Sequence, residues 1–337
     1  MPIFSMRVFV RIFFVCFLLG LTVSLFVFGT KKKAEVKKDE LYFKTFRKRA
    51  EGWIRTLGGE KAYKRVKEEF KENPNDSHGE LHVFGELLYT IEGLTSFTVC
   101  DQDFGFGCYH GFMGQAIAEK GVDVAYTLDA ECIKRHGPHG LGCFHGLGHG
   151  LGEYFGPNRI NEQLKICKSL SWKGLYAGCQ DGAIMEYHFP TSQTGIGTRQ
   201  QLKIFQKDNP YDPCPTVEDM FKRACYYRLP SWWNELFHDF DKIGDLCGAV
   251  DDNTERKSCF LGIGNAFHPQ YKINQSEIQV LCKTAKKYTD GAYCYAGSRW
   301  ALFVLGRTDD ASALCESLSE EDKVICMTKW NLIEYTE

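Results

Sequence analysis

The chain has 337 residues, of which 44% are hydrophobic and 25% charged, and its formal net charge is −2. This composition excludes a disordered polypeptide, and 33 glycines without a G-X-Y period exclude collagen. Fifteen cysteines are more than a reduced cytosolic enzyme ordinarily carries, so their spacing indicates both the compartment and the architecture.

An uncharged apolar segment occupies residues 12–29, behind a short N-terminal tail of residues 1–11. Eighteen uncharged, mostly apolar residues suffice for a helix to span a bilayer, and no small-residue cleavage site follows them. The segment therefore predicts an uncleaved single-pass signal anchor, with the lipid bilayer as its partner.

Charge is distributed unevenly behind this anchor. Residues 30–75 hold fifteen Lys and Arg against eight Asp and Glu, a net charge of +7. Since Arg7 and Arg11 add +2 in residues 1–29, residues 76–337 carry −11. We expect the first segment to be a basic, helical juxtamembrane stalk that faces lipid headgroups. The acidic body argues against nucleic-acid binding, which relies on Lys and Arg. The lysines after the anchor outnumber the two arginines before it, so the positive-inside rule by itself favours a cytoplasmic body.

The cysteines outside the anchor form seven pairs whose members are 8 to 12 positions apart. The pairs are Cys100 with Cys108, Cys132 with Cys143, Cys167 with Cys179, Cys214 with Cys225, Cys247 with Cys259, Cys282 with Cys294, and Cys315 with Cys326. The second member recurs every 32 to 36 residues, except for one interval of 46, and a glycine follows three residues later in five of the seven units. A period near 34 with two helix-length stretches per unit is typical of a stacked array of helical hairpins.

We therefore predict an all-α fold in which residues 76–337 form about seven disulfide-stapled helical hairpins, an α/α solenoid or toroid behind the transmembrane helix. The first cysteine of each pair is expected at the end of one helix and the second at the start of the next. The glycine should let a neighbouring backbone come close. The alternative is that the thiols bind zinc in the cytosol, but the short C-x₂₋₄-C spacings of zinc sites are absent. Disulfides favour an extracytoplasmic body, in the periplasm, a lumen or outside the cell.

Function is expected where the units differ from one another. Two positions after the second cysteine, the first three units have His110, His145 and Asp181, whereas later units have other residues. His149 follows His145 by four residues, so both imidazoles lie on one helix face, a spacing that can chelate a metal ion. Because neighbouring helices pack about 8–10 Å apart, His110 and Asp181 could reach the same point. These four residues are the first candidate metal ligands.

A second pair with the same spacing, His78 and His82, precedes the first unit. If the unit boundaries are right, this pair lies far from His110 and forms a separate metal site; if they are wrong, it joins the first. A histidine at any one of these positions can instead be a hydrogen-bonded structural residue. Seven of the ten histidines nevertheless lie between residues 78 and 149, which favours a metal or catalytic site.

The resulting hypothesis is a membrane-anchored, extracytoplasmic protein whose His/Asp cluster binds a divalent transition metal. Zn, Fe, Mn and Cu all accept such ligands, so the metal stays open, as does the question of catalysis. If the protein is an enzyme, it is a metal-dependent hydrolase or oxidoreductase that activates water or oxygen. The alternative is a non-catalytic scaffold that binds a protein or glycan on its repeat surface, with Trp232 and Trp233 as a possible contact.

Overall fold

The computed structural model describes residues 41–72, 77–190, 202–266, 275–304 and 307–329. The described chain is all-helical and contains no β-strand. A helix over residues 41–57 is followed by α2 (Gly59–Phe70), α3 (His78–Glu92), α4 (Gly107–Lys120), α5 (Val124–His136), α6 (Leu141–Phe155), α7 (Ile160–Ser169) and α8 (Cys179–His188). The second half comprises α9 (Asp219–Phe237), α10 (Phe240–Gly248), α11 (Asn253–Asn265), α12 (Gln275–Ala285), α13 (Tyr293–Val304), α14 (Thr308–Glu316) and α15 (Glu320–Thr328).

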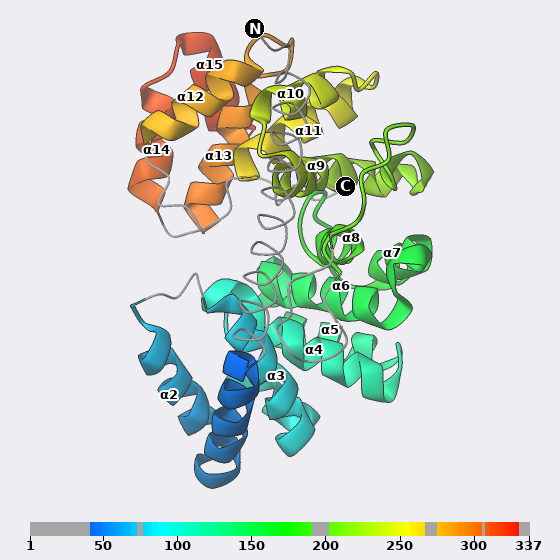
Figure 1. Ribbon diagram of the computed structural model, residues 1–337, viewed down its shortest axis with the longest axis vertical. Coiled ribbons are helices and arrows are strands. Elements are labelled where there is room, and N and C mark those ends of the chain that lie inside the picture. Colours follow the sequence, from blue (N-terminus) through cyan, green and yellow to red (C-terminus); the bar gives the residue numbers. More distant parts are fainter. Residues whose placement is uncertain (1–40, 73–76, 191–201, 267–274, 305–306, 330–337) are drawn as a thin grey trace, which may run out of the picture.

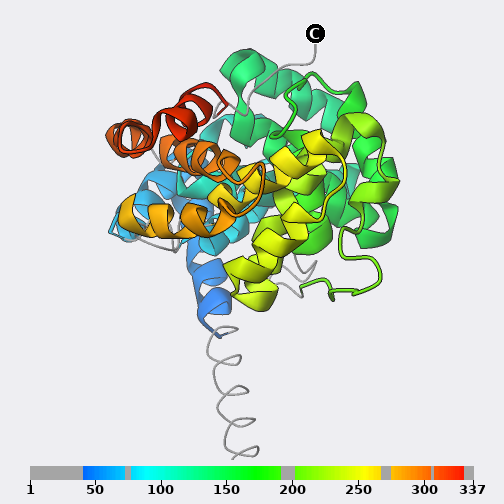
Figure 2. The ribbon, with the colours of Figure 1, turned by 90° about the horizontal axis from the view of Figure 1, so that it is seen from above.

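One set of helices forms the inner layer of the molecule, in which each member packs against the next: α3, α4, α6, α8, α9, α11 and α13. Helices α5, α7, α10, α12 and α14 pack against this layer. In Figure 1 the succession runs along the long axis from α2 to α14, and Figure 2 shows the chain from above. In Figure 1, α2 and α14 lie on the left and α7 and α8 on the right, so the succession curves. In Figure 2 the orange and red helices lie on the left and the green ones on the right.

All seven predicted cysteine pairs are disulfide-bonded, with Cα–Cα distances of 5.4 to 5.7 Å. The bridges join Cys100 to Cys108, Cys132 to Cys143, Cys167 to Cys179, Cys214 to Cys225, Cys247 to Cys259, Cys282 to Cys294, and Cys315 to Cys326. Seven disulfides indicate an oxidising, extracytoplasmic compartment.

Five of the first cysteines lie in an α-helix, as predicted. The other two differ, because Cys100 follows the 3₁₀-helix η1 (Leu94–Val99) and Cys214 begins the 3₁₀-helix η5 (Cys214–Thr216). Pro213 and Pro215 flank Cys214 and lack the N–H groups that an α-helix requires there.

The second cysteines differ in how far they lie from the start of their helix. Four of them begin a helix or lie in its first turn, as predicted: Cys108, Cys143, Cys179 and Cys294. For the other three the prediction was wrong, because they lie more than one turn inside α9, α11 and α15: Cys225, Cys259 and Cys326. Two of these helices begin before the predicted position because a polar residue caps them. The side chain of Asp252 accepts hydrogen bonds from backbone N–H groups in the first turn of α11, and that of Ser319 accepts one in the first turn of α15.

The glycines after the second cysteines permit close backbone contact between inner helices, as predicted. A Cβ atom on Gly182 would lie 2.1 Å from the carbonyl oxygen of His145, and one on Gly111 would lie 1.8 Å from that of His82. The same relationship joins Gly297 to Leu261, at 1.9 Å. No side chain fits at these distances, so glycine sets the separation between neighbouring inner helices.

Residues 41–70, part of the expected stalk, pack against α3. Phe46, Ala50 and Ile54 of the first helix and Val66 of α2 are at most 2% exposed. Arg47 forms an ion pair with Glu86 of α3, so basic residues of this segment contact acidic residues of the body. Among the described residues no helix is both long and apolar enough to cross a membrane. The predicted anchor, residues 12–29, lies outside them.

Candidate metal centre

Five histidine side chains from three consecutive inner helices meet in one cluster. Helix α3 contributes His78 and His82, α4 contributes His110, and α6 contributes His145 and His149. The His110 ring lies between the two pairs, with its centroid 4.9 Å from that of His82 and 4.3 Å from that of His149. The close packing at glycines such as Gly111 brings the three helices near enough for these contacts.

The pair on α6 has hydrogen bonds that fix the orientation of both rings. His145 Nδ1 lies 3.1 Å from Asp181 Oδ2, and His149 Nδ1 lies 2.9 Å from Glu186 Oε2, both acids being on α8. With each Nδ1–H donating to a carboxylate, each Nε2 has a lone pair and no proton. These two Nε2 atoms lie 3.1 Å apart. Carboxylates that hold the outer nitrogen of an imidazole in this way are the usual second shell of metal-binding histidines.

Asp181 is held as a carboxylate by a second partner. Arg228 of α9 donates from Nε to Oδ1 at 2.8 Å and from a terminal nitrogen to Oδ2 at 2.6 Å. Burial alone would raise the pKa of Asp181, but Arg228 and His145 lower it to about 2. Asp181 is therefore ionised and can only accept a hydrogen bond from His145. Arg228 lies three residues after Cys225, where five of the seven units have glycine, and its acidic partner is this internal carboxylate.

A positive charge between the facing lone pairs of His145 and His149 would stabilise this arrangement. Two unprotonated nitrogens repel each other at 3.1 Å, and a proton on either ring would relieve the repulsion. Burial disfavours protonation of either ring, since it lowers the pKa of His149 to about 3 and also lowers the pKa of His145. His149 is 2% exposed. A metal ion bound by both nitrogens resolves the repulsion without a buried imidazolium.

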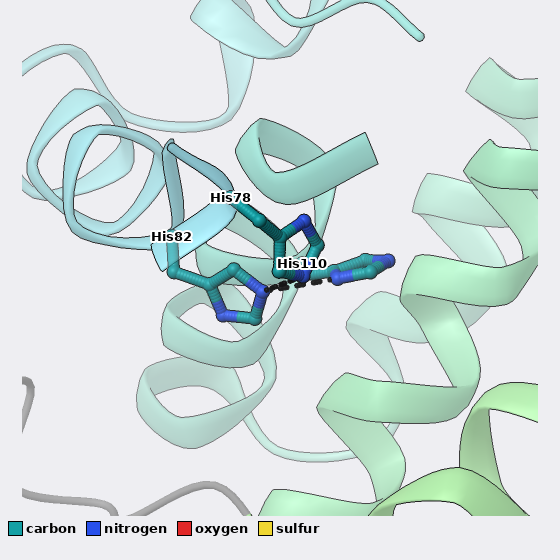
Figure 3. A group of neighbouring side chains, drawn as sticks. All are labelled: His78, His82 and His110. Carbon is teal, nitrogen blue, oxygen red and sulfur yellow. Dashed lines mark hydrogen bonds between the residues drawn. The ribbon is translucent and has the colours of Figure 1, made fainter. Parts of the chain in front are cut away.

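The pair on α3 converges on the other side of His110 (Figure 3). His82 Nε2 lies 2.9 Å from His78 Nε2 and 3.1 Å from His110 Nδ1. His78 Nδ1 donates to the carbonyl oxygen of Phe104 at 2.8 Å, which leaves its Nε2 as a lone pair. One proton on His82 Nε2 can satisfy one of its two contacts but not both, so this trio also has the geometry of a ligand set.

Two groups of three histidines are close enough for metal binding: His78, His82 and His110, and His110, His145 and His149. In each group one candidate ligand atom per residue lies within 4.8 Å of the others. The chain is thus a helical protein with histidine clusters that could hold a metal ion. Of the two positions considered for His78 and His82, the structure has the one beside His110. Asp181, predicted as a ligand, belongs to neither group and contacts His145 from outside.

Helix α3 was not recognised from the sequence as an inner helix because it has no cysteine pair. Its glycine pattern could have identified it. A Cβ on Gly85 would lie 2.1 Å from the carbonyl oxygen of Cys108, and one on Gly148 would lie 2.0 Å from that of Cys179. Gly85 follows His82 by three residues and Gly148 follows His145 by three. His82 therefore corresponds to His145.

Other candidates from the sequence have structural roles. Trp232 and Trp233 are at most 1% exposed, so they belong to the core and do not form a contact surface. His136 Nε2 lies 2.7 Å from the hydroxyl of Tyr109. Glu186 holds His149 in place.

Comparison with known proteins gives no relative. No family model matches the chain, and no curated protein or solved structure is significantly similar to it.

Proposed function

We propose that this chain is a membrane-anchored, extracytoplasmic metalloprotein in which stacked helical hairpins bind a divalent transition metal through histidine. His145, His149 and His110 are the ligands, and Asp181 and Glu186 orient the first two. The observation that carries the proposal is the 3.1 Å separation of two Nε2 atoms whose Nδ1 atoms are both engaged by carboxylates. Three imidazoles with a further open position suit Zn, Fe, Mn or Cu.

The burial of this site limits the chemistry that it can perform. His110 and His149 are each 2% exposed, and the His145 side chain is 12% exposed. A polymer or a bulky ester would not reach an ion held by these nitrogens, whereas water, oxygen and peroxide are small enough. We therefore favour an enzyme that acts on a small oxygen species. The alternative without a redox step is hydration or hydrolysis of a small molecule.

Elemental analysis tests the proposal. Full-length protein purified in detergent without chelator should contain transition metal, and the variant His145→Ala/His149→Ala should lose it. His136→Ala is the matched control, since it removes an imidazole from the same part of the molecule but outside the cluster. Far-UV circular dichroism establishes that each variant is folded. Equal, near-zero metal in wild type and variant, before and after incubation with Zn²⁺, Mn²⁺, Fe²⁺ or Cu²⁺, would contradict metal binding.

A second candidate function is supported by a basic cavity in the other half of the molecule. It has a volume of about 200 Å³, and its lining includes Arg223, Lys257, Lys329, Tyr176 and Tyr293. Within the part of the chain that the structure describes, none of the three cations forms an ion pair with a carboxylate. This lining suits an acidic partner, and the sugar-sized volume with two tyrosines favours an acidic glycan over a protein.

Binding of a sulfated oligosaccharide tests this alternative. Arg223→Ala/Lys257→Ala should weaken binding at least tenfold, and affinity should fall with salt because the contacts are ionic. The surface variant Lys134→Ala/Lys165→Ala removes the same charge elsewhere and should bind as wild type. Equal affinity of both double variants would contradict a glycan site in this cavity.

A further inference from the structure

His110 belongs to both histidine groups, and this shared position is the most informative feature of the cluster. Its Nδ1 faces His82 Nε2 at 3.1 Å. Its Nε2 is buried and has no hydrogen-bond partner in the described structure. In Figure 3 the ring extends away from His78 and His82, with the second nitrogen directed away from that pair. A histidine that is 2% exposed and has an unsatisfied nitrogen requires an explanation.

We propose that His110 bridges two metal ions as an imidazolate, with Nδ1 bound to an ion shared with His78 and His82, and Nε2 bound to an ion shared with His145 and His149. The inference rests on the proposed function and extends it from one ion to a pair. Binding of the second ion displaces the remaining ring N–H proton, which leaves to solvent, so the bridge carries one negative charge. No oxidant or reductant is needed.

The dimensions of the cluster agree with such a pair. The two ring nitrogens of an imidazole are about 2.2 Å apart, and ligand nitrogens bind at about 2.1 Å, so the bridged ions would be about 6 Å apart. Ring centroids of the flanking histidines lie 4.3 to 5.2 Å from that of His110 on both sides. Nitrogens around one ion lie about 3.0–3.5 Å apart at this bond length, close to the 2.9 to 3.1 Å between the nitrogens here.

The two halves of the pair have different surroundings. The His145/His149 half has two anionic residues behind it, Asp181 and Glu186. The His78/His82 half has a backbone carbonyl, that of Phe104, behind His78. Anionic second-shell partners raise the basicity of the imidazole, so the first half should bind its ion more tightly. We therefore expect two binding steps of unequal affinity, the weaker one dependent on His78 and His82.

Metal stoichiometry and electron paramagnetic resonance test the bridge. Full-length protein titrated with Cu²⁺ should bind two ions per chain, and the spectrum should lose most of its intensity as the second ion binds, because an imidazolate couples the two spins. His78→Ala/His82→Ala should bind one ion and show an uncoupled spectrum of full intensity. His136→Ala is the control and should behave as wild type.

The outcomes separate this inference from the proposed function. One ion per wild-type chain, unchanged by His78→Ala/His82→Ala, would overturn the bridged pair and leave the proposed single-metal site standing. Two ions with an uncoupled spectrum in wild type would also overturn the bridge. Absence of metal from every variant would overturn both. His110→Ala provides a second measurement: this variant should show no coupled spectrum at any copper loading, and a coupled spectrum would overturn the bridge.

Discussion

Arg228 and Asp181 form a buried, bidentate ion pair, with nitrogen–oxygen distances of 2.8 and 2.6 Å. Arg228 occupies the position, three residues after Cys225, at which five of the seven units have glycine. Between other inner helices this glycine allows backbone contact, as Gly182 does against His145. Between α8 and α9 a charged pair replaces that contact, and it anchors the carboxylate that orients His145. The ion pair therefore connects the packing of the second half of the molecule to the histidine cluster.

The substitution Asp181→Asn should impair both stability and metal binding. Loss of the carboxylate leaves the Arg228 charge buried and unpaired, which costs about 3–5 kcal/mol. It also removes the anionic partner of His145, so metal affinity should fall about 10–100-fold. Urea unfolding and metal titration measure the two effects. In the double variant Asp181→Asn/Arg228→Met the unpaired charge is gone, so stability should recover while affinity stays low. Wild-type affinity in either variant would contradict the second-shell role of Asp181.

The features that repeat from unit to unit could be predicted from the sequence, whereas the places where the chain departs from the repeat could not. Cysteine spacing identified all seven disulfides, and the glycine that follows the second cysteine in five of the seven units correctly indicated close helix packing. The alignment of His110, His145 and Asp181 also followed from the repeat. The cysteine pattern did not identify helix α3, because this helix lacks cysteines, so His82 was not aligned with His145. The pairing of Arg228 with Asp181 depends on which helices are neighbours in space, and no local pattern encodes that.

Glycine substitutions should separate the packing of the inner helices from general helix stability. Gly182→Ala places a Cβ 2.1 Å from the carbonyl oxygen of His145, so α6 and α8 must move apart. We expect a loss of about 1–3 kcal/mol and weaker metal binding, because His145 and Asp181 lie on these two helices. The matched control is Gly52→Ala, where no atom lies within 4 Å and the helix should gain up to about 1 kcal/mol. Similar unfolding midpoints for the two variants would contradict the packing role of Gly182.

The buried histidines should make the metal-free protein sensitive to mild acid. Burial lowers the pKa of His149 to about 3 and the pKa of His110 well below 6.5, the value expected in the unfolded chain. Between those pKa values the unfolded chain binds more protons than the folded chain. The contribution of these histidines to stability is therefore constant above about pH 7 and falls as the pH drops below 6.5. Each such histidine contributes up to about 1.4 kcal/mol per pH unit. Urea midpoints measured in chelator at about pH 7.5, 6 and 5 should fall less steeply for His149→Gln, and identical slopes would contradict the prediction.

Disulfide removal should affect metal binding only where the bridge supports the cluster. The Cys132–Cys143 bridge joins α5 to α6 two residues before His145, whereas the Cys315–Cys326 bridge joins α14 to α15 near the other end of the chain. Both bridges span 11 positions, so replacing either pair by serine should cost about 3 kcal/mol in the chain-entropy account. Metal affinity should fall in the first variant, because the first turn of α6 is no longer held, and stay at the wild-type value in the second. Urea unfolding combined with metal titration measures both quantities, and an equal loss of affinity in the two variants would mean that the disulfides act on the fold as a whole and not on the site.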